Sequence, residues 1–373
     1  MARNTGKKVR RRGRRRKRGF ATWSIGKKIG AVLGGTLLGV VVIGSVILAS
    51  KMNKLSSVKL DTDKLNISDE VKHEKGYTNV ALFGLDSRGK NLGKGNRTDT
   101  IMIASINNET KKVKLVSVYR DTMLKQNGEH YDKANAAYSV GGPETAVNML
   151  NENLDLDIQD YVSVNFLALA DVIDMVDGIT VKLTDEEVVH MNNYCVETSK
   201  VTGKKYKKIE PAVAGTYKLN GVQAVSYARI RYTAGGDYKR TERQRLVLKK
   251  TADKLKQQDL ATLNKIIDKV MPEVSTSFTT KEILSLATGA FDYELGETAG
   301  FPFDLETPEQ IPGYSGSYVI PKGLEENVIK LHQFLYPNKD YTPTATVTDI
   351  SNTLNDMTNV YPNTTESGTS QNE

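Results

Sequence analysis

Cysteine is almost absent from this 373-residue chain, and its few histidines are scattered. The single cysteine, Cys195, excludes an internal disulfide, and no CxxC pair is present. The four histidines show no HExxH or similar spacing, which argues against a structural zinc site or a histidine metalloprotease. The G-x-S-x-G and P-loop motifs are also missing from the sequence. The chemistry of the chain must therefore lie in other residue types.

Arginine is scarce outside the first 50 residues. Lysine is spread along that part of the chain, whereas arginine falls in two patches, at 88–120 and 229–245. The planar guanidinium group carries a fixed fork of donors that matches phosphate oxygens bidentately. We therefore expect the two patches to hold an anion. Their members are Arg88, Arg97, Arg120, Arg229, Arg231, Arg240, Arg243 and Arg245.

The net charge of +8 comes from the N-terminus alone. Residues 1–28 hold 13 lysines and arginines and no acid, which leaves 39 basic and 44 acidic residues elsewhere, a net charge of −5. A basic run of this kind can bind nucleic acid, but beside a membrane span it more often contacts anionic lipid. Since the rest of the chain has no nucleic-acid-binding signature, we expect membrane lipid and no nucleic acid as its partner.

An uncharged run at 29–49 follows this cytoplasmic tail. As a helix it would be roughly 32 Å long, close to the thickness of the bilayer core. The positive charges before it place the N-terminus in the cytoplasm and the body outside the cell membrane. A cleaved signal peptide is the alternative, but the basic region is too long and no A-x-A site follows. The sequence thus predicts a single-pass signal anchor, and its small-xxx-small glycine pairs are typical of a weak dimer contact.

The body reads as one α/β domain. We expect a linker at 50–75, an extracellular catalytic domain at 76–340 and a disordered polar tail at 341–373, which is rich in Thr, Asn and Ser. Mixed strands and helices predict a sheet between two helical layers, an α-β-α sandwich. The predicted strands are 79–84, 100–106, 112–118, 161–164 and 179–183. The predicted helices begin at Pro143, at Phe166 and near Asp237, and cover 263–270, 281–290 and 322–335.

Three successive strands begin or end with an arginine and an aspartate. Ligands of open α/β sheets bind where strand ends meet loops, so these groups are predicted to converge. Three separate surface ion pairs are the alternative. The groups are Asp86 with Arg88, Arg97 with Asp99, and Arg120 with Asp121.

The second arginine patch extends into a predicted helix. Arg229 and Arg231 would face the same side of an extended backbone, and Asp237 fits as the N-cap of the helix that follows. Arg240, Arg243 and Gln244 would then share a helix face. Cations in a first helical turn oppose the helix dipole by about 0.3–1 kcal/mol each, and a bound anion would relieve this. An amphipathic surface helix of mixed charge is the alternative.

Carboxylates and arginines together fit phosphoryl chemistry. A hard divalent ion held by carboxylates would bridge phosphate oxygens, while arginines would neutralise the charge of the transition state.

Several segments, in order and with similar spacing, resemble the LytR-CpsA-Psr family. They are GLDSR, RTDTIMIASIN, KVKLVSVYRDT, DYVSVNF, YKLNGVQAVSYARIRY and GDYKRTERQ. The resemblance covers roughly 77–244 strongly and extends weakly to about 336. It implies an α-β-α sandwich and a membrane-anchored phosphotransferase. Such an enzyme moves a glycopolymer, for example teichoic acid or capsule, from a polyprenyl-pyrophosphate carrier to peptidoglycan through a phosphodiester link.

The resemblance also implies roles for individual residues. Asp86 and Asp99 would hold Mg²⁺ or Mn²⁺. Catalytic roles fall to Arg88, Arg120, Asp121, Arg229 and Arg231, and pyrophosphate binding to Arg97, Asp237, Arg240, Arg243 and Gln244. Either Asp121 or Asp237 would orient an arginine or accept the proton of the acceptor hydroxyl. Arg245 projects differently along its helix and is expected at the surface.

One departure from the family pattern lies beside this site, where Tyr119 occupies a position that usually holds proline. Three alternatives remain for the function. They are a hydrolase of polyprenyl pyrophosphate, a non-catalytic lipid-pyrophosphate-binding or regulatory membrane protein, and a DNA-binding regulator that would work through its basic tail.

Overall fold

The computed structural model describes residues 56–57, 59–61, 64–68, 71, 76–87, 92–279, 282 and 293–363. The predictions for the basic tail, the span at 29–49, Arg88 and nearly all of the helix at 281–290 lie outside these residues. Within them, no helix combines the length and the apolar content needed to cross a bilayer.

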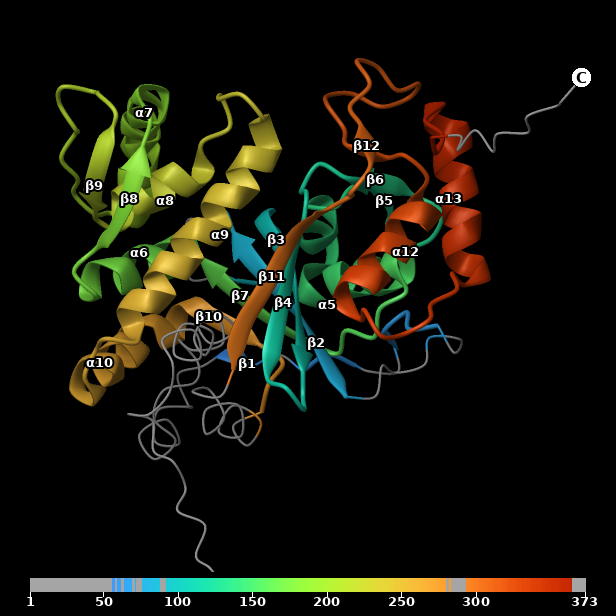
Figure 1. Cartoon of the computed structure of the whole chain (residues 1–373), viewed down its shortest axis with the longest axis horizontal. Coiled ribbons are helices and arrows are strands. Elements are labelled where there is room, and N and C mark those ends of the chain that lie inside the picture. Colours follow the sequence, from blue (N-terminus) through green and yellow to red (C-terminus); the bar gives the residue numbers. More distant parts are fainter. Residues whose placement is uncertain are drawn as a thin grey trace, which may run out of the picture.

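A mixed seven-stranded sheet forms the centre of the molecule (Figure 1). The strand order is β1-β10-β7-β2-β3-β4-β11. β2, β3 and β4 are antiparallel, whereas β7 is parallel to β2 and β11 is parallel to β4. The bounds are β1 Ser56–Ser57, β2 Tyr77–Leu85, β3 Thr98–Asn107, β4 Lys112–Val118, β7 Asp160–Asn165, β10 Val274–Thr276 and β11 Glu294–Phe301.

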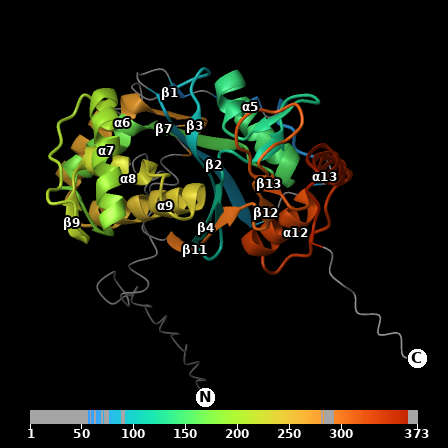
Figure 2. The ribbon, with the colours of Figure 1, turned by 90° about the horizontal axis from the view of Figure 1, so that it is seen from above.

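Alternating side chains of β2 supply two separate cores. Ala81 and Phe83 pack on one face, with α5, α12 and α13, while Val80 and Leu82 pack on the other, with α6 and α10. This alternation follows from the two-residue period of a strand that is covered on both faces. Figures 1 and 2 show the two helical layers on opposite sides of the sheet. The bounds are α5 Ala136–Leu154, α6 Phe166–Met175, α10 Leu260–Val270, α12 Leu324–Leu335 and α13 Ala345–Thr358.

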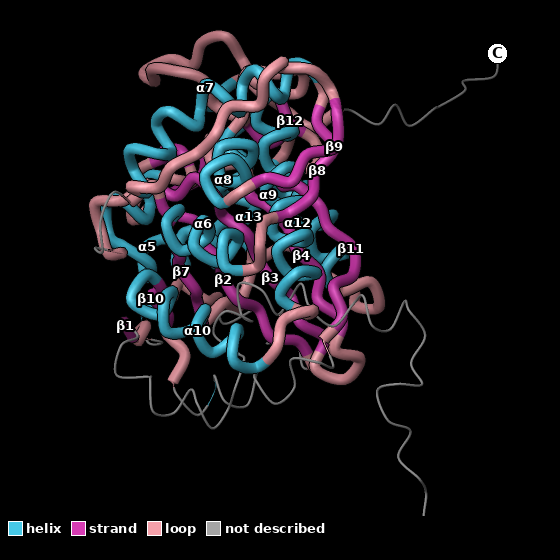
Figure 3. Tube along the Cα trace, turned by 90° about the vertical axis from the view of Figure 1, so that its left-hand side faces the viewer, coloured by secondary structure: helices cyan, strands magenta, loops and turns pink. Residues whose placement is uncertain are grey.

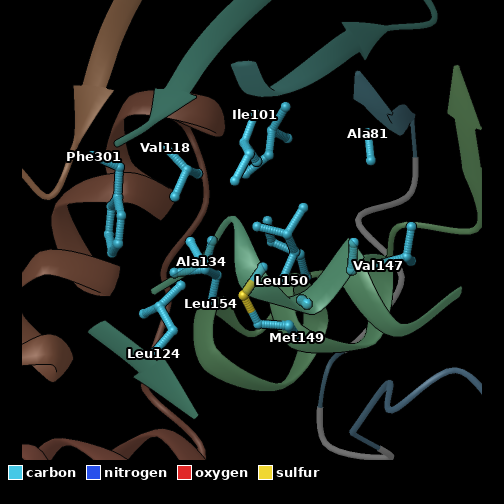
Figure 4. Packing of buried hydrophobic residues seen from close by; sticks show 14 of the residues in the cluster. Ala81, Ile101, Val118, Leu124, Ala134, Val147, Met149, Leu150, Leu154 and Phe301 are labelled. Carbon is cyan, nitrogen blue, oxygen red and sulfur yellow. The ribbon is translucent and has the colours of Figure 1, made fainter. Parts of the chain in front are cut away.

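Helix α5 forms the centre of the first core. Leu150 of α5 faces Ile101 of the sheet (Figure 4). The helix bends at Gly142, whose φ of 76° is left-handed and therefore suits glycine, and Pro143 begins the second half. The predicted helix is therefore present, but α5 already begins at Ala136, and Pro143 opens only its second half.

A smaller lobe completes the second layer and carries one wall of the site. It consists of α7 (Asp185–Thr202), α8 (Gly221–Arg229), the start of α9 (Gly236–Leu255) and the hairpin of β8 (Ile179–Leu183) and β9 (Gly215–Leu219). The strand predicted at 179–183 therefore exists, but it belongs to this hairpin and not to the main sheet. Figure 3 views the molecule from the side of α6, α8 and α10.

The expectation of a disordered tail from 341 is wrong up to residue 363. Helix α13 buries Val347, Ile350 and Leu354 in the first core, so this segment belongs to the domain. Further short strands lie near the site: β5 (Met123–Lys125), β6 (Tyr131–Lys133), β12 (Leu305–Glu306) and β13 (Ile320–Pro321).

Candidate functional site

The pairing register of the sheet brings the Arg–Asp groups of the first patch together. Leu85 near the end of β2 pairs with Thr98 at the start of β3, and Ile101 of β3 pairs with Val118 at the end of β4. The segments after β2, before β3 and after β4 therefore share one edge of the sheet. There the backbone N–H of Asp86 donates to the carbonyl of Arg97, at 3.1 Å.

A cavity of about 890 Å³ opens at this edge, between the sheet, α7 and the start of α9. Arginines from both patches line it, although the patches lie more than a hundred residues apart in the sequence. Its lining consists of Asp86, Arg97, Asp99, Arg120, Asp121, Lys133, Asn135, His190, Asn193, Tyr194, Glu197, Arg229, Arg231, Tyr232 and Arg240. We call this the polar cavity.

Two arginines of the polar cavity share Asp121 and Asp237. Arg120 donates to Asp99 and lies 3.5 Å from Asp121. Arg231 lies 3.6 Å from Asp121 and 3.8 Å from Asp237, and Asp237 lies 4.0 Å from Arg120. The carboxylates thus hold the guanidinium groups close together in spite of their mutual repulsion.

Arg240 is the most buried of these cations. Its side chain is 2% exposed and makes one ion pair, 2.9 Å from Asp237. Within the described part of the chain, its Nε and Nη1 have no hydrogen-bond partner. Burial lowers the pKa of Arg240 to about 10, against the opposing effect of Asp237. Buried donors without partners are costly, so an anion in the polar cavity would stabilise this arginine.

The pKa values of Asp121 and Asp237 are shifted in opposite directions. Burial favours the neutral form of Asp121, but Arg120, Lys133 and Arg231 outweigh it and lower its pKa. Burial raises the pKa of Asp237, because Arg240 offsets it only in part and Asp121 adds repulsion. Asp121 faces the polar cavity, whereas Asp237 lies behind the arginines that it pairs with.

A second, narrow cavity of about 50 Å³ adjoins the first and is almost entirely apolar. Its walls come from the ends of β2 and β7 and from α6, α8 and α9, and they include Val164, Phe166 and Leu248. Arg229 lines both cavities and stacks over the ring of Phe166, 5.0 Å from its centroid. A cation therefore marks the junction between the polar cavity and this apolar cavity.

The residues of the second patch lie on different structural elements from those predicted. Arg229 ends helix α8 and Arg231 lies in the following loop, so the two do not share an extended strand, although both line the polar cavity. Asp237 lies in the first turn of α9, and Gly235 is the N-cap, so the prediction of an Asp237 cap is wrong.

Two further residues of α9 do not line the polar cavity. Arg243 donates to Glu187, to the carbonyl of Ile230 and to Thr233, which fixes the loop that carries Arg231. Gln244 lines the apolar cavity and donates to the carbonyl of Asp99, at 3.2 Å. The prediction that both residues face the anion is therefore corrected.

Arg245 is half-buried, not a surface residue. It donates to Ser117 of β4, at 2.8 Å, and lies away from both cavities.

The sequence predictions missed the wall contributed by α7. His190, Asn193, Tyr194 and Glu197 lie on successive turns of one helix face, a spacing that a search for charged motifs does not select. Lys133 was also missed. Its Nζ lies 3.2 Å from Asp121 and over the ring of Tyr318, so it adds a cation to the side of the polar cavity opposite α7.

Both predicted metal ligands line the polar cavity. Asp86 follows β2 and Asp99 belongs to β3. In the described part of the chain, no group of three or more His, Cys, Asp or Glu side chains is arranged to hold a metal ion. Two carboxylates nevertheless fit Mg²⁺, which commonly takes one or two protein carboxylates and completes its shell with phosphate oxygens and water.

The model of the LytR_cpsA_psr family matches residues 42–294, more than half of the chain. The chain belongs to this family. It is 29% identical over 272 residues to the polyisoprenyl-teichoic acid–peptidoglycan teichoic acid transferase TagU of Enterococcus faecalis, covering 71% of this chain and 84% of that protein. It is 32% identical over 221 residues to biofilm regulatory protein A of Streptococcus mutans, covering 56% of this chain and 52% of that relative's length.

Solved structures of the family share the fold. A Streptococcus agalactiae protein covers 74% of this chain and 93% of its own, with a TM-score of 0.57 and 25% identity. The family protein YwtF (TagT), solved with octaprenyl pyrophosphate, covers 74% of this chain and 99% of its own, with a TM-score of 0.53 and 22% identity. The predicted mixed α/β fold of the family is thus confirmed.

The unusual Tyr119 ties the site to the end of the sheet. Its backbone N–H donates to the carbonyl of Phe301 at 2.9 Å, a bond that proline cannot form. Its ring packs edge-on against Tyr238, next to Asp237, with 4.7 Å between centroids. The substitution therefore fastens the Arg120 loop to both β11 and α9.

Proposed function

We propose that this protein is a phosphotransferase that moves a glycopolymer from a polyprenyl-pyrophosphate carrier to peptidoglycan. The observation that carries the proposal is the junction at Arg229, where a cation-lined cavity meets an apolar one. A lipid pyrophosphate has the same two parts, a dianionic head and a hydrocarbon tail. Burial, paired carboxylates and the unpaired donors of Arg240 support an anionic head in the polar cavity.

In this proposal the arginines of the polar cavity surround the pyrophosphate. Arg120, Arg229, Arg231 and Arg240 contact its oxygens, Arg97 assists from the exposed rim, and Arg88 belongs to the same group by its place in the family motif. Mg²⁺ or Mn²⁺ held by Asp86 and Asp99 would neutralise phosphate charge. Arg243 positions the Arg231 loop, and Gln244 positions α9 against β3.

The transfer step forms one bond and breaks one. The acceptor hydroxyl oxygen attacks the phosphorus that carries the glycan, the P–O–P bridge breaks, and polyprenyl phosphate leaves with the bridging oxygen. Asp121 accepts the hydroxyl proton, because it faces the polar cavity and Asp237 does not.

We further propose that residues 29–49 anchor the protein in the cell membrane and that the domain lies outside the cell. The lipid carrier would then enter from the bilayer, and the transferred polymer would be joined to the wall. In intact protoplasts, added protease should cleave the domain, and protection of the domain would contradict this orientation.

A transfer assay tests the proposed activity. The full chain in detergent is mixed with a polyprenyl-pyrophosphate-linked glycopolymer, peptidoglycan oligomers and Mg²⁺, and the phosphodiester product is measured. A hydrolase would instead release the polymer without joining it to the acceptor, and a binding protein would give no turnover. The double variant Arg229→Ala, Arg231→Ala should lose transfer, and full activity in that variant would exclude the arginine assignment.

A further inference from the structure

The two sides of the polar cavity differ in chemistry. On the sheet side, it is lined by aspartates, arginines and Lys133, which suit phosphate and metal. On the side of α7, its lining is mostly aromatic or neutral and polar. The residues of this second side are His190, Asn193, Tyr194 and Glu197 of α7 and Tyr232 of the loop between α8 and α9, and we call them the α7 wall.

Tyr232 gives the α7 wall an open aromatic surface. It is 72% exposed and lines the polar cavity. Its ring lies at 30° to that of Tyr194 and at 36° to that of His190, with centroids 6.4 and 6.3 Å apart. The exposed ring of Tyr232 is therefore open to a ligand. Exposed aromatic groups beside convergent polar groups are typical of binding sites.

A network beneath the α7 wall holds it in place. Thr184 and Glu187 form a capping box at the start of α7, and Glu187 also accepts from Arg243 at 2.9 Å. Arg243 in turn donates to the carbonyl of Ile230 and to Thr233, on either side of Tyr232. Helix α7 and the Tyr232 loop are thus fastened to the same side chain of α9. Such a surface is organised before any ligand arrives, which lowers the entropy cost of binding.

The α7 wall adjoins the groups proposed to bind phosphate. Tyr232 follows Arg231 directly, and Glu197 of α7 lies 3.1 Å from Arg229. A group that is covalently joined to a bound phosphate would therefore reach the α7 wall without leaving the polar cavity. A pyranose ring has an apolar C–H face for the tyrosine rings and hydroxyl or amide groups for Asn193 and Glu197.

We propose that the α7 wall is the subsite for a pyranose sugar of the substrate, with Tyr232 as its stacking platform. This inference rests on the proposed phosphotransferase function. Sugar of this kind occurs both in the lipid-linked donor and in the peptidoglycan acceptor. The same surface chemistry serves either source, and the two arms of the test distinguish them.

The donor arm measures binding alone. Octaprenyl pyrophosphate, and the same lipid carrying one N-acetylglucosamine on the pyrophosphate, are titrated into the full chain in detergent. If the platform holds the donor sugar, Tyr232→Ala weakens binding of the glycosylated lipid by roughly three- to tenfold and leaves binding of the bare lipid unchanged. Tyr232→Phe retains the ring and should stay close to the wild type. Tyr361→Ala, at an exposed tyrosine beyond α13, is the matched control.

The acceptor arm measures the KM for a soluble peptidoglycan tetrasaccharide in the transfer assay. If the platform holds the acceptor sugar, Tyr232→Ala raises this KM by a similar factor, and Tyr232→Phe does not. If neither arm responds to Tyr232→Ala, the subsite is excluded. If the wild type binds both lipids but performs no transfer, the proposed function fails, and the donor arm still decides whether the α7 wall binds sugar.

Discussion

Arg240 and Asp155 are two charged residues that are each 2% exposed, in opposite halves of the molecule. Both oxygens of Asp155 accept hydrogen bonds, from the Tyr341 hydroxyl and from the backbone N–H and hydroxyl of Thr344. Among the residues that the structure describes, Arg240 has one ion pair, and its Nε and Nη1 have no hydrogen-bond partner. The two side chains are thus equally buried, but they differ in how many of their polar atoms are hydrogen-bonded. Asp155 fastens α13 to the domain, whereas the environment of Arg240 is incomplete without an anion.

The largest effect is expected at Arg240, where a substitution should lower the transfer rate but not the stability of the protein. Arg240→Met should lower the transfer rate by about 10²–10³-fold, as expected when a donor to transition-state charge is removed. Its melting temperature should change little, because loss of the ion pair with Asp237 is offset by removal of a buried cation with unsatisfied donors, and Asp237 keeps Arg231 at 3.8 Å. The transfer assay measures the rate, and thermal unfolding with and without octaprenyl pyrophosphate measures stability and binding; the lipid should stabilise the wild type more than the variant. A large loss of stability would show that Arg240 is structural.

At Asp155, a substitution should lower the stability of the protein but not its binding of lipid. Asp155→Asn keeps the side chain's shape but points an N–H group at donors, and should lower the free energy of unfolding by about 2 kcal/mol. Below its unfolding temperature this variant should bind octaprenyl pyrophosphate like the wild type. Urea denaturation gives the stability, with Asp349→Asn on the exposed face of α13 as the control. Equal stability of the two variants would remove the role assigned to Asp155.

Arg243 gives an intermediate case on the same helix as Arg240. Because its guanidinium is engaged by Glu187, Ile230 and Thr233, Arg243→Ala should both destabilise the protein by about 1–2 kcal/mol and disturb the Arg231 loop. We expect KM for the lipid donor to rise by about fivefold while kcat changes less. Arg245→Ala, which releases Ser117 of β4 and lies away from both cavities, should leave KM unchanged.

The smallest effect concerns pH. The pKa of Asp237 is raised, so the folded protein binds a proton more readily than the unfolded chain between the usual value of 3.8 and the raised one. In that window, Asp237 makes stability fall as pH rises. The pKa of Asp121 is lowered, so its contribution is present above 3.8 and is lost as pH falls through the lower folded value. Unfolding free energies of Asp237→Asn and the wild type should therefore converge toward pH 3.8, and a constant difference would contradict this.

The sequence predicts the sheet side of the polar cavity well. Arg97, Asp99, Arg120 and Asp121 flank apolar runs whose two-residue period is clear, and antiparallel pairing of neighbouring strands then brings their ends together. No tertiary information beyond this register is needed.

The α7 side and the C-terminal helix needed the structure. Tyr232 and Asn193 become neighbours only through packing of α7 on α8, which leaves no spacing rule in the sequence. Around Leu354, a surplus of Thr and Asn conceals apolar residues spaced three and four apart. Arg240 and Arg243 are three residues apart, about 60° around the helix, and their long side chains diverge to opposite partners. Spacing alone cannot resolve that difference.

The pairing of the outer strands also has a consequence for how the chain folds. Ser56 of β1 pairs with Ser275 of β10, and Val118 of β4 pairs with Phe301 of β11. Such contacts close very long loops, and loop closure must precede the gain from pairing, so they favour slow folding. The antiparallel β2-β3-β4 unit, with connections of 12 and 4 residues, can form first. Both edges of the sheet can be completed only when residues 274–301 are available. A chain that ends before them would therefore carry unpaired edge strands, which are prone to association.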